Sequence, residues 1–451
     1  MELLLGNCLD RLKDLEDNSV DAIVTDPPYG LSFMGKKWDY DVPSVDIWKE
    51  CLRVLKPGGY LLSFAGTRTQ HRMAVNIEDA GFEIRDMIAW VYGSGFPKSL
   101  NIGKAIDKIQ GNEREVVERN IAYPDSDCWS TPNKNKGSES TIWQKGEGEE
   151  FGKGGVIKTT KGTSEWEGFG TALKPALEPI TLARKPIEKG LSIAENCLKW
   201  GVGGINIDGC RVEIDPIADA SQLRTMNRSA KEEKNGWGMN QNAGDIPQVV
   251  SHTGRFPANL IHDGSDEVVG LFPQTKSGKL KSDCYEKDRE NDSMFAGGGN
   301  YTHKGYQADS GSASRFFKTC EFAEGEAQRF LYTAKASKRE RNIGCEGLEK
   351  RAGGSNAKGY TQDVARGLDR NRPVANFHPT VKPIALMEYL VKLVSREGQV
   401  ILDPFMGSGT TGMACKKLDR EFIGIEMMPE YMEIAKRRIG GVKKEDQLNM
   451  I

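Results

Sequence analysis

The chain has 451 residues, and its 62 lysines and arginines nearly balance 64 aspartates and glutamates, which leaves a net charge of -2. Global charge therefore does not indicate a nucleic-acid partner, and any grip on DNA must come from local basic surface. Nine cysteines without a C-x-x-C pair and only five histidines argue against a zinc module or a disulfide framework, so no metal site is expected.

The N-terminal residues lack the basic region and the long apolar run of a signal peptide, and no stretch approaches the length of a transmembrane helix. We therefore expect no membrane partner and a cytoplasmic location, in a bacterium or a phage-infected host cell. The length suffices for a large core or for about two to three domains.

Apolar runs alternate with helical patterns over the first 95 residues. The expected strands are 3–5, 20–25, 60–64 and 82–90. The expected helices are one that carries Leu9, Leu12 and Leu15, one that carries Trp48, Leu52 and Leu55 and stops at Lys56-Pro57-Gly58-Gly59, and one at 75–80. This alternation predicts a parallel α/β sheet.

The periodic pattern is lost twice in the middle of the chain, at residues 93–172 and 205–372, with an expected strand at 178–184 between them. A compact domain rarely holds so much loop without purpose, so we interpret both stretches as insertions into one sheet that serve recognition or stay partly disordered until a partner binds. A surface embellishment with no role is the alternative, and it is favoured less for the second stretch than for the first.

The α/β pattern returns after Pro383. We expect helices at 384–394, 412–417 and 429–439, and strands at 399–402 and 421–425. The tail from Lys443 is charged and is expected to be frayed.

The tetrapeptide Asp26-Pro27-Pro28-Tyr29 ends the expected strand 20–25. Neither proline has an N–H to donate, so the strand cannot continue its ladder and the turn is rigid. The strand end then offers a carboxylate, backbone carbonyls and an aromatic ring, which suit a planar amine such as that of adenine or cytosine. The alternatives are a turn cap for Asp26 and a plain core aromatic for Tyr29.

A glycine-rich segment, Asp403-Pro404-Phe405-Met406-Gly407-Ser408-Gly409-Thr410-Thr411-Gly412, follows the expected strand 399–402. Its glycines satisfy G-x-G-x-x-G between a strand and a helix, where a ligand can approach the backbone and the helix N-terminus favours a negative group. Glu426 closes the next strand, where a carboxylate can bind both hydroxyls of a ribose. Loop and acid together leave NAD and S-adenosylmethionine about equally open.

These motifs resemble those of the amino-directed DNA methyltransferases, which modify adenine N6 or cytosine N4. The family's catalytic tetrapeptide is similar to Asp26–Tyr29, its cofactor loop to Asp403–Thr411, and its preceding cofactor segment to His378-Pro379-Thr380-Val381-Lys382-Pro383. The catalytic motif comes first and the cofactor motif last, as in the family's β class. The resemblance covers residues 1–100 and 375–440, with a weaker similarity at Lys174–Pro186.

The resemblance implies S-adenosyl-L-methionine as the cofactor and a Rossmann-like α/β methyltransferase sheet that is circularly permuted, with the strands ending at Asp26 and Asp403 as neighbours. The implied cofactor-binding residues are Asn7, Lys382, Asp403, Phe405, Gly407, Gly409, Thr410 and Glu426. An acid is usual in the family where Asn7 stands, and a pure turn role for Asn7 is an equal alternative.

The implied reaction is site-specific methylation of the N6 amine of adenine in duplex DNA. Asp26 and a Pro27 carbonyl would accept hydrogen bonds from the amine, Pro28 would stiffen the turn, and Tyr29 would stack on the flipped base. In the family a tetrapeptide that begins with Asp goes mostly with adenine and one that begins with Ser mostly with cytosine, so cytosine N4 is the alternative.

We divide the chain into a catalytic half of the core (1–95), an irregular insertion (96–172), a return to the core (173–194), a target-recognition insertion (195–372), a cofactor-binding half of the core (373–440) and a tail (441–451). Basic residues near aromatic ones suit phosphate contacts and an extruded base. In the recognition insertion they are Lys335, Lys338, Arg339 and Arg341 after Phe330-Leu331-Tyr332, and Arg366, Arg370 and Arg372. A solvated helix face explains residues 335–341 nearly as well.

Double-stranded DNA is the expected partner. Members of the β class are often dimers, so a second copy of the chain is a candidate partner, as is a restriction endonuclease. Rival functions are methylation of RNA or protein amines, a DNA-binding relative without catalysis and, more distantly, an NAD oxidoreductase.

Overall fold

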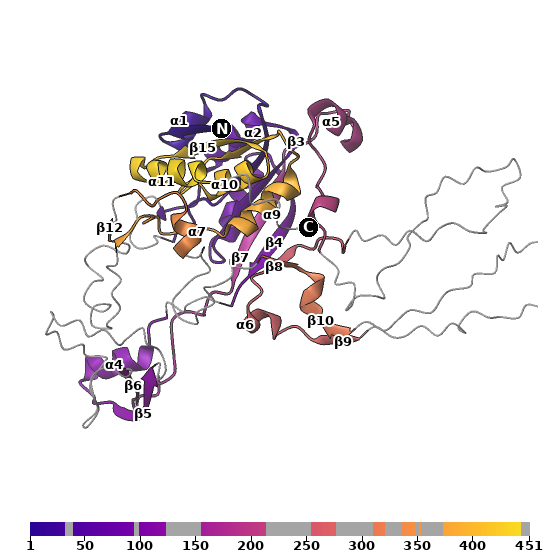
Figure 1. Cartoon of the computed structure of the whole chain (residues 1–451). Helices are drawn as coiled ribbons and strands as arrows, with labels where there is room; N and C mark the ends of the chain where they lie inside the picture. The colour runs from indigo at the N-terminus through magenta and orange to yellow at the C-terminus, as the bar shows by residue number, and fades with distance from the viewer. Residues whose placement is uncertain are drawn as a thin grey trace, which may run out of the picture.

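The computed structural model describes residues 1–31, 39–93, 99–122, 155–212, 254–276, 310–320, 336, 338–348, 351–352 and 373–442. These residues contain a nine-stranded central sheet (Figure 1). In spatial order its strands are β1 (Glu2–Leu5), β15 (Glu421–Glu426), β14 (Val400–Asp403), β2 (Val20–Thr25), β3 (Leu55–Phe64), β7 (Leu177–Arg184), β4 (Glu83–Val91), β8 (Leu260–His262) and β11 (Lys318–Thr319).

The strand order makes the first strand and the last strand of the chain neighbours. β14 pairs in parallel with β2, and β15 pairs in parallel with both β14 and β1. Helix α11 (Pro429–Gly440) contacts β15 and β1, so the last helix precedes the first strand in space as if the termini were joined. The permuted α/β sheet is therefore confirmed, and Asp26 and Asp403 stand at neighbouring strand ends.

One strand runs against the others. β7 pairs antiparallel with β3 and β4, whereas the remaining pairings of this sheet are parallel. The expectation of a wholly parallel sheet is wrong here, because an apolar run shows that a strand exists but not its direction. As a result, the start of β7 lies beside the carboxyl ends of its neighbours.

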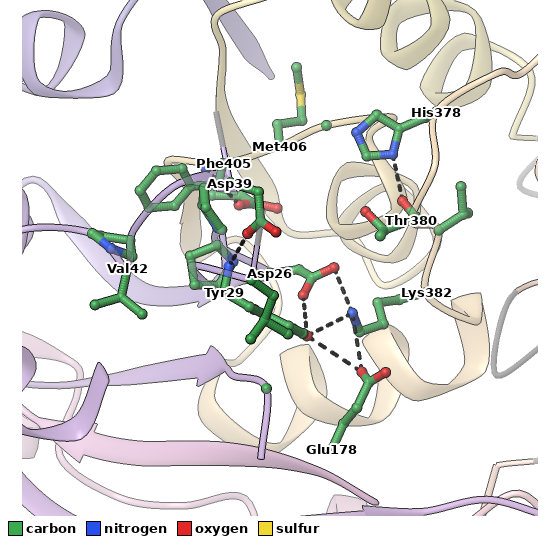
Figure 2. Close-up of a pocket in the computed structure, with 18 of the residues that line it drawn as sticks. Asp26, Tyr29, Asp39, Val42, Glu178, His378, Thr380, Lys382, Phe405 and Met406 are labelled. Carbon is green, nitrogen blue, oxygen red and sulfur yellow. Dashed lines mark hydrogen bonds and ion pairs between the residues drawn. The ribbon is translucent and has the colours of Figure 1, made fainter. Parts of the chain in front are cut away.

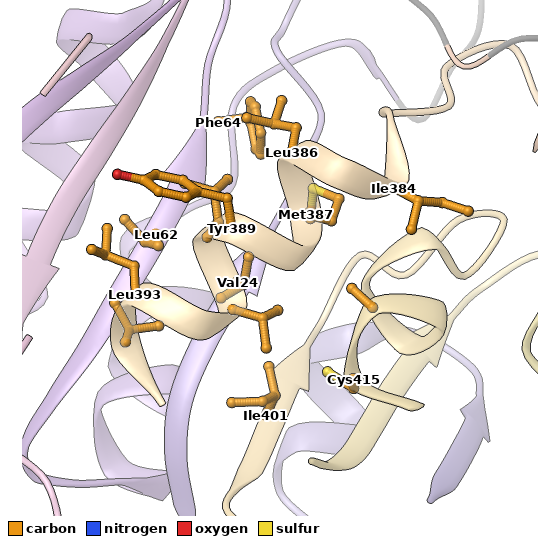
Figure 3. Packing of buried hydrophobic residues seen from close by; sticks show 14 of the residues in the cluster. Val24, Leu62, Phe64, Ile384, Leu386, Met387, Tyr389, Leu393, Ile401 and Cys415 are labelled. Carbon is orange, nitrogen blue, oxygen red and sulfur yellow. The ribbon is translucent and has the colours of Figure 1, made fainter. Parts of the chain in front are cut away.

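Helices cover both faces of the sheet. One face packs against α1 (Cys8–Leu12), α2 (Val45–Val54) and α3 (Gln70–Asp79), and the other against α9 (Ile384–Val394), α10 (Thr410–Lys417) and α11. Ile23 packs in the core on the side of α1, α2 and α3, and Val24 packs in the core on the side of α9, α10 and α11. This is expected for the alternating side chains of a strand that is buried on both faces. Figure 3 shows Val24, Leu62 and Phe64 under α9.

β3 begins earlier than the sequence indicates. Helix α2 ends at Val54, and the residues predicted as a turn, Lys56–Gly59, belong to β3, where its register with β2 shifts. The Lys56 Nζ atom lies 2.7 Å from Asp21 Oδ1, and a Cβ on Gly59 would lie 2.8 Å from the Asp21 carbonyl oxygen. The absence of a side chain at Gly59 thus allows β2 and β3 to approach each other closely. In the sequence, the same glycine looks like part of a turn.

Helix α3 also begins earlier than predicted, at Gln70 instead of residue 75. Its polar first turn has no apolar repeat, so the sequence pattern missed it. The other predicted helices and strands of the core start within about two residues of the observed ones, as is usual for element boundaries.

The middle of the chain is more regular than expected. Helix α4 (Ile102–Gln110) and the antiparallel pair β5 (Glu115–Ala122) and β6 (Gly155–Lys161) lie together, away from the central sheet (Figure 1). β8 and β11 extend that sheet beyond β4 although they fall in the range predicted as a recognition insertion. Strands this short leave no periodic pattern in a sequence.

The remaining described elements are short. They are α5 (Ile193–Trp200), η4 (Asp208–Cys210), α6 (Asp266–Val269), β9 (Gln274–Lys276), β10 (Ser310–Ser312), η7 (Ala313–Phe316), α7 (Lys338–Asn342), β12 (Arg351–Ala352) and β13 (Pro373–Val374). The predicted frayed tail from Lys443 and the basic positions 335, 366, 370 and 372 lie outside the described residues.

Candidate active site

The carboxyl ends of β2, β14 and β15 open into one cavity of about 1250 Å³. The tetrapeptide after β2, the glycine-rich loop after β14 and Glu426 at the end of β15 all line it, so the structure brings the two predicted motifs together. Of the predicted site residues, Gly409 is the one outside the lining. It caps helix α10 with a left-handed φ of +79°.

Asp26, Tyr29 and Lys382 form a hydrogen-bonded group in this cavity (Figure 2). The Lys382 Nζ atom lies 2.6 Å from Asp26 Oδ2, and the Tyr29 hydroxyl donates to Asp26 Oδ1 over 2.7 Å. Lys382 also donates to the Tyr29 hydroxyl over 3.2 Å. The catalytic and cofactor segments are therefore joined through the Asp26 carboxylate, and Tyr29 contributes a polar contact as well as a ring.

Glu178 at the start of β7 completes this group. Its Oε2 atom lies 3.3 Å from Lys382 Nζ and 3.5 Å from the Tyr29 hydroxyl oxygen, so it is a second, longer acceptor for that hydroxyl. The sequence motifs do not single out Glu178, although it falls in the weak similarity at Lys174–Pro186. That similarity was the one signal that could have found it.

The charges of this group stabilise one another. Burial disfavours the ammonium form of Lys382, but the carboxylates of Asp26 and Glu178 outweigh it, and the pKa of Lys382 is raised. Burial, followed by the negative charges of Asp26 and Glu178, raises the pKa of Tyr29 well above its usual value. Lys382 is therefore a cation and Tyr29 a neutral hydrogen-bond donor at neutral pH.

The backbone of the tetrapeptide is held by side chains from two other segments. Asp39 Oδ1 accepts from the backbone N–H groups of Tyr29 and Gly30 over 2.7 and 3.0 Å. The Thr69 hydroxyl donates to the Tyr29 carbonyl over 2.6 Å. Asp39 and Thr69 were not predicted, and they fix the turn that presents Tyr29.

Asp403 is buried and braces the glycine-rich loop. Its Oδ1 atom accepts from the Thr25 hydroxyl over 2.7 Å and from the Phe405 N–H over 3.1 Å, and its Oδ2 atom accepts from the Thr411 hydroxyl over 2.6 Å. Burial raises the pKa of Asp403 to about 6 despite these bonds. The carboxylate thus ties the end of β14 to β2 and to helix α10.

Glu426 links the loop to the helix that follows β15. Its Oε2 atom accepts from the Gly407 N–H over 2.9 Å, and its Oε1 atom accepts from the Met428 N–H over 2.7 Å. Burial raises the pKa of Glu426 to about 7. The carboxylate lies against the loop and at the cavity wall, where it was expected to bind a ribose.

Gly407 faces His378 across a narrow space. Its φ is +54°, and a Cβ there would lie 2.9 Å from His378 Nε2. The Nδ1 atom of His378 is 2.5 Å from the Thr380 carbonyl, which can only accept, so Nδ1 carries the proton. Burial lowers the pKa of His378 to about 3, and the ring is neutral.

Arg438 on α11 is fully buried and binds the glycine-rich loop, a role that was not predicted. Arg438 Nη1 on α11 donates to the Ser408 carbonyl over 2.8 Å and to the Thr410 hydroxyl over 2.9 Å. Burial lowers the pKa of Arg438 to about 10. The Thr410 side chain, predicted to bind the cofactor, is therefore engaged by α11 in this structure.

Asn7 and Phe405 also line the cavity, each with a structural contact. Asn7 Oδ1 accepts from the Leu9 N–H over 2.9 Å and caps α1. The Phe405 ring meets Trp48 edge-on with 6.3 Å between centroids. The turn role that was the alternative for Asn7 is thus realised, while its position at the cavity wall keeps the cofactor role open.

Arg341, part of the predicted basic cluster, points inward. Its Nη2 atom donates to the His378 carbonyl over 2.6 Å, and burial lowers its pKa. The expectation that it contacts phosphate finds no support in this geometry, because the guanidinium supports the His378 segment. Arg339, two residues earlier, is exposed.

Two further findings concern the part of the chain that the structure describes. None of its helices is long and apolar enough to cross a membrane. Among the same residues, no group of three or more His, Cys, Asp or Glu side chains is arranged to hold a metal ion.

The family model described as DNA methylase, for N6 and N4 methyltransferases, matches residues 20–264 and 266–437. Since this match spans most of the chain, the protein belongs to that family. The resemblance to the amino-directed DNA methyltransferases, predicted from the two motifs, is confirmed.

Individual relatives match shorter segments. The type II methyltransferase M2.DpnII of Streptococcus pneumoniae is 51% identical over 65 residues, which are 14% of this chain and 24% of the relative. M2.LlaDCHI of Lactococcus lactis subsp. cremoris is 35% identical over 123 residues, 27% of this chain and 45% of the relative. The chain thus matches less than half the length of these relatives.

Two solved structures are similar over most of the chain. The M1.HpyAVI–SAM complex has a TM-score of 0.36 and 16% identity, and covers 97% of this chain and 98% of that one. The PvuII DNA methyltransferase, described as cytosine-N4-specific, has a TM-score of 0.39 and 12% identity, with 97% and 85% covered. At these scores neither similarity bears on function.

Proposed function

We propose that this protein is an S-adenosylmethionine-dependent DNA methyltransferase that methylates the N6 amine of adenine in duplex DNA. The observation that carries the proposal is the single cavity shared by the Asp26 tetrapeptide and the glycine-rich loop, with Asp26 and Lys382 in direct contact. Membership of the DNA methylase family supports the same class of reaction.

The cofactor half of the cavity fits a nucleoside with a charged tail. Gly407 leaves room that a side chain would fill, and Glu426 offers carboxylate oxygens at the wall. Phe405 offers a ring face, and Asn7 an amide. S-adenosylmethionine would supply an electrophilic methyl group on its sulfonium.

The tetrapeptide would prepare the amine of the target base. That nitrogen is a poor nucleophile because its lone pair is delocalised into the ring. Hydrogen bonds from its N–H groups to the Asp26 carboxylate and the Pro27 carbonyl draw it toward tetrahedral geometry and free the lone pair. The Tyr29 ring offers a face for a base that has left the duplex stack.

Adenine is proposed because the tetrapeptide begins with Asp26, as in most adenine-directed members of the family. The named relatives are type II methyltransferases, which is consistent with a restriction-modification role. We also propose that the chain forms a homodimer and works with a partner endonuclease. The division of the chain at residues 95, 172, 194, 372 and 440 is likewise a proposal.

The test is to express the chain in a host without DNA methylation, digest the DNA to nucleosides and identify methylated bases by mass spectrometry. We expect N6-methyladenine, absent when Asp26 is replaced by Ala. N4-methylcytosine alone would overturn the choice of base. In parallel assays, transfer of a labelled methyl group to DNA, RNA and protein is compared. Transfer to RNA or protein but not to DNA would overturn the DNA assignment.

A further inference from the structure

Glu178 reaches the candidate active site by the reversed direction of β7. Because this strand is antiparallel to β3 and β4, its first residues lie at the edge where the parallel strands end. The Glu178 side chain is 19% exposed and lines the same cavity as Asp26. The proposed reaction itself assigns no role to this carboxylate.

Both groups that bind Asp26 also reach Glu178. Lys382 Nζ is 2.6 Å from Asp26 Oδ2 and 3.3 Å from Glu178 Oε2. The Tyr29 hydroxyl is 2.7 Å from Asp26 Oδ1 and 3.5 Å from the same Glu178 oxygen. Figure 2 shows the four side chains converging, so one glutamate oxygen is a second acceptor for each donor that occupies Asp26.

This sharing matters because each oxygen of the Asp26 carboxylate already faces one donor in the structure. An ammonium and a hydroxyl already donate to its two oxygens, while the proposed reaction needs it to accept from the amine of a base. With Asp26 as its only carboxylate partner, the buried Lys382, whose side chain is 9% exposed, would form a closed ion pair. Such a pair resists opening because separation leaves a buried charge unpaired.

We infer that Glu178 is a positioning residue that keeps the Asp26 carboxylate available to the substrate amine by accepting Lys382 and the Tyr29 hydroxyl. The inference rests on the proposed function. When the amine donates to Asp26, the Lys382 ammonium moves toward Glu178 and keeps a carboxylate partner. The Tyr29 hydroxyl has the same second acceptor, so no donor is left unsatisfied.

The experiment compares purified wild-type protein with Glu178→Gln in single-turnover methyl transfer to unmethylated DNA, beside the dissociation constant for S-adenosylmethionine. Glutamine keeps the size and removes the charge. We expect the transfer rate to fall about 10- to 100-fold, because Asp26 would no longer be correctly placed for the amine. The affinity for S-adenosylmethionine should change less than about twofold. Glu178→Asp, which restores the charge, should recover part of the rate.

Glu188→Gln is the matched control. Glu188 also accepts from a lysine and an aromatic N–H, at 2.5 Å from Lys199 Nζ and 2.6 Å from Trp200 Nε1, but it lies outside the cavity. This variant should match the wild-type rate.

A wild-type rate in Glu178→Gln would overturn the inference while leaving the proposed function intact. A loss of cofactor affinity equal to the loss of rate would also overturn it, because Glu178 would then bind cofactor. The same holds if Glu178→Asp is as slow as Glu178→Gln with both variants folded. Absence of transfer by the wild-type protein would instead refute the proposed function, and the inference with it.

Discussion

Tyr29 contributes a hydroxyl to the site as well as the ring that its sequence context predicts. Tyr29→Phe keeps the ring and removes the bond to Asp26 Oδ1. Loss of a hydrogen bond to a charged group should lower the single-turnover transfer rate about tenfold. Tyr60→Phe is the control, because the Tyr60 hydroxyl is buried 3.4 Å from the Gly203 carbonyl, outside the cavity. An unchanged rate in Tyr29→Phe would mean that the ring alone matters.

At Gly407, a side chain on the glycine-rich loop would collide with His378. In Gly407→Ala the new Cβ would meet His378 Nε2 at 2.9 Å on a backbone with φ +54°. Since such strain costs about 1–3 kcal/mol, we expect the affinity for S-adenosylmethionine, measured by calorimetry, to fall about tenfold. Gly398→Ala is the control for backbone strain alone, with φ +75° and no atom within 4 Å of its Cβ. Equal affinities for S-adenosylmethionine in the two variants would contradict a role of Gly407 in cofactor binding.

Glu426 makes the stability of the protein depend on pH. Its pKa is raised from 4.5 to about 7 in the folded state, so it binds a proton more tightly when folded. Its contribution is therefore present below about pH 4.5 and is lost as the pH rises through about 7. Relative to Glu426→Gln, which does not titrate, the wild-type protein should lose about 3 kcal/mol between these pH values.

Urea unfolding of both proteins at pH 4.5, 6 and 7.5 measures that difference. The comparison isolates Glu426, because neighbouring groups such as His378 titrate in both proteins. A difference that stays constant with pH would contradict the raised pKa.

At the scale of elements, helix α11 supports the cofactor loop through one buried residue. Arg438→Met removes the bonds from Nη1 to the Ser408 carbonyl and the Thr410 hydroxyl, at 2.8 and 2.9 Å. We expect a loss of about 3 kcal/mol in the free energy of unfolding, together with weaker cofactor binding. Chemical denaturation and calorimetry measure the two effects.

The neighbouring Arg437→Met serves as the matched control. Arg437 is half-exposed and forms an ion pair with Glu433, 2.9 Å away on the same helix. A pair of this kind contributes at most about 1 kcal/mol, so the variant should keep cofactor affinity. Equal destabilisation by both substitutions would show that α11 needs only positive charge at its end.

β7 is the strand of the central sheet whose direction differs from the parallel sheet that the sequence predicted. Its apolar run predicts a strand, and that strand exists. Only pairing with β3 and β4 shows that it runs antiparallel, and this direction brings Glu178 to Asp26. A parallel strand in the same place would carry Glu178 to the opposite edge of the sheet.

At the scale of the whole molecule, the recognition region proposed for 195–372 can be tested without disturbing the sheet. A chimera that takes residues 213–253 and 277–309 from another family member retains β8 and β11. We expect the methylated sequence to change, as read by base-resolution modification sequencing, while the core chemistry persists. Exchange of residues 123–154 is the control and should leave the target unchanged. An unchanged target in the first chimera would contradict the proposal.

The sequence by itself determined the core chemistry and the architecture around it. Asp26-Pro27-Pro28-Tyr29 and the loop from Asp403 are contiguous, and each follows an apolar strand, so local pattern is enough to find them. Their order along the chain predicted the permuted sheet in which β14 lies beside β2. Glu426 was found in the same way, as the acid at the end of a strand.

Only the tertiary structure decided which side chains support that chemistry. Glu178 and Arg438 lie far in sequence from the groups they contact, and an isolated Glu or Arg looks the same whether it is solvated or buried. The roles of Asp403 and Arg341 depend on burial and hydrogen-bond partners, since these set their pKa values and occupy their polar atoms. Such contacts form between distant segments, and no local periodicity encodes them.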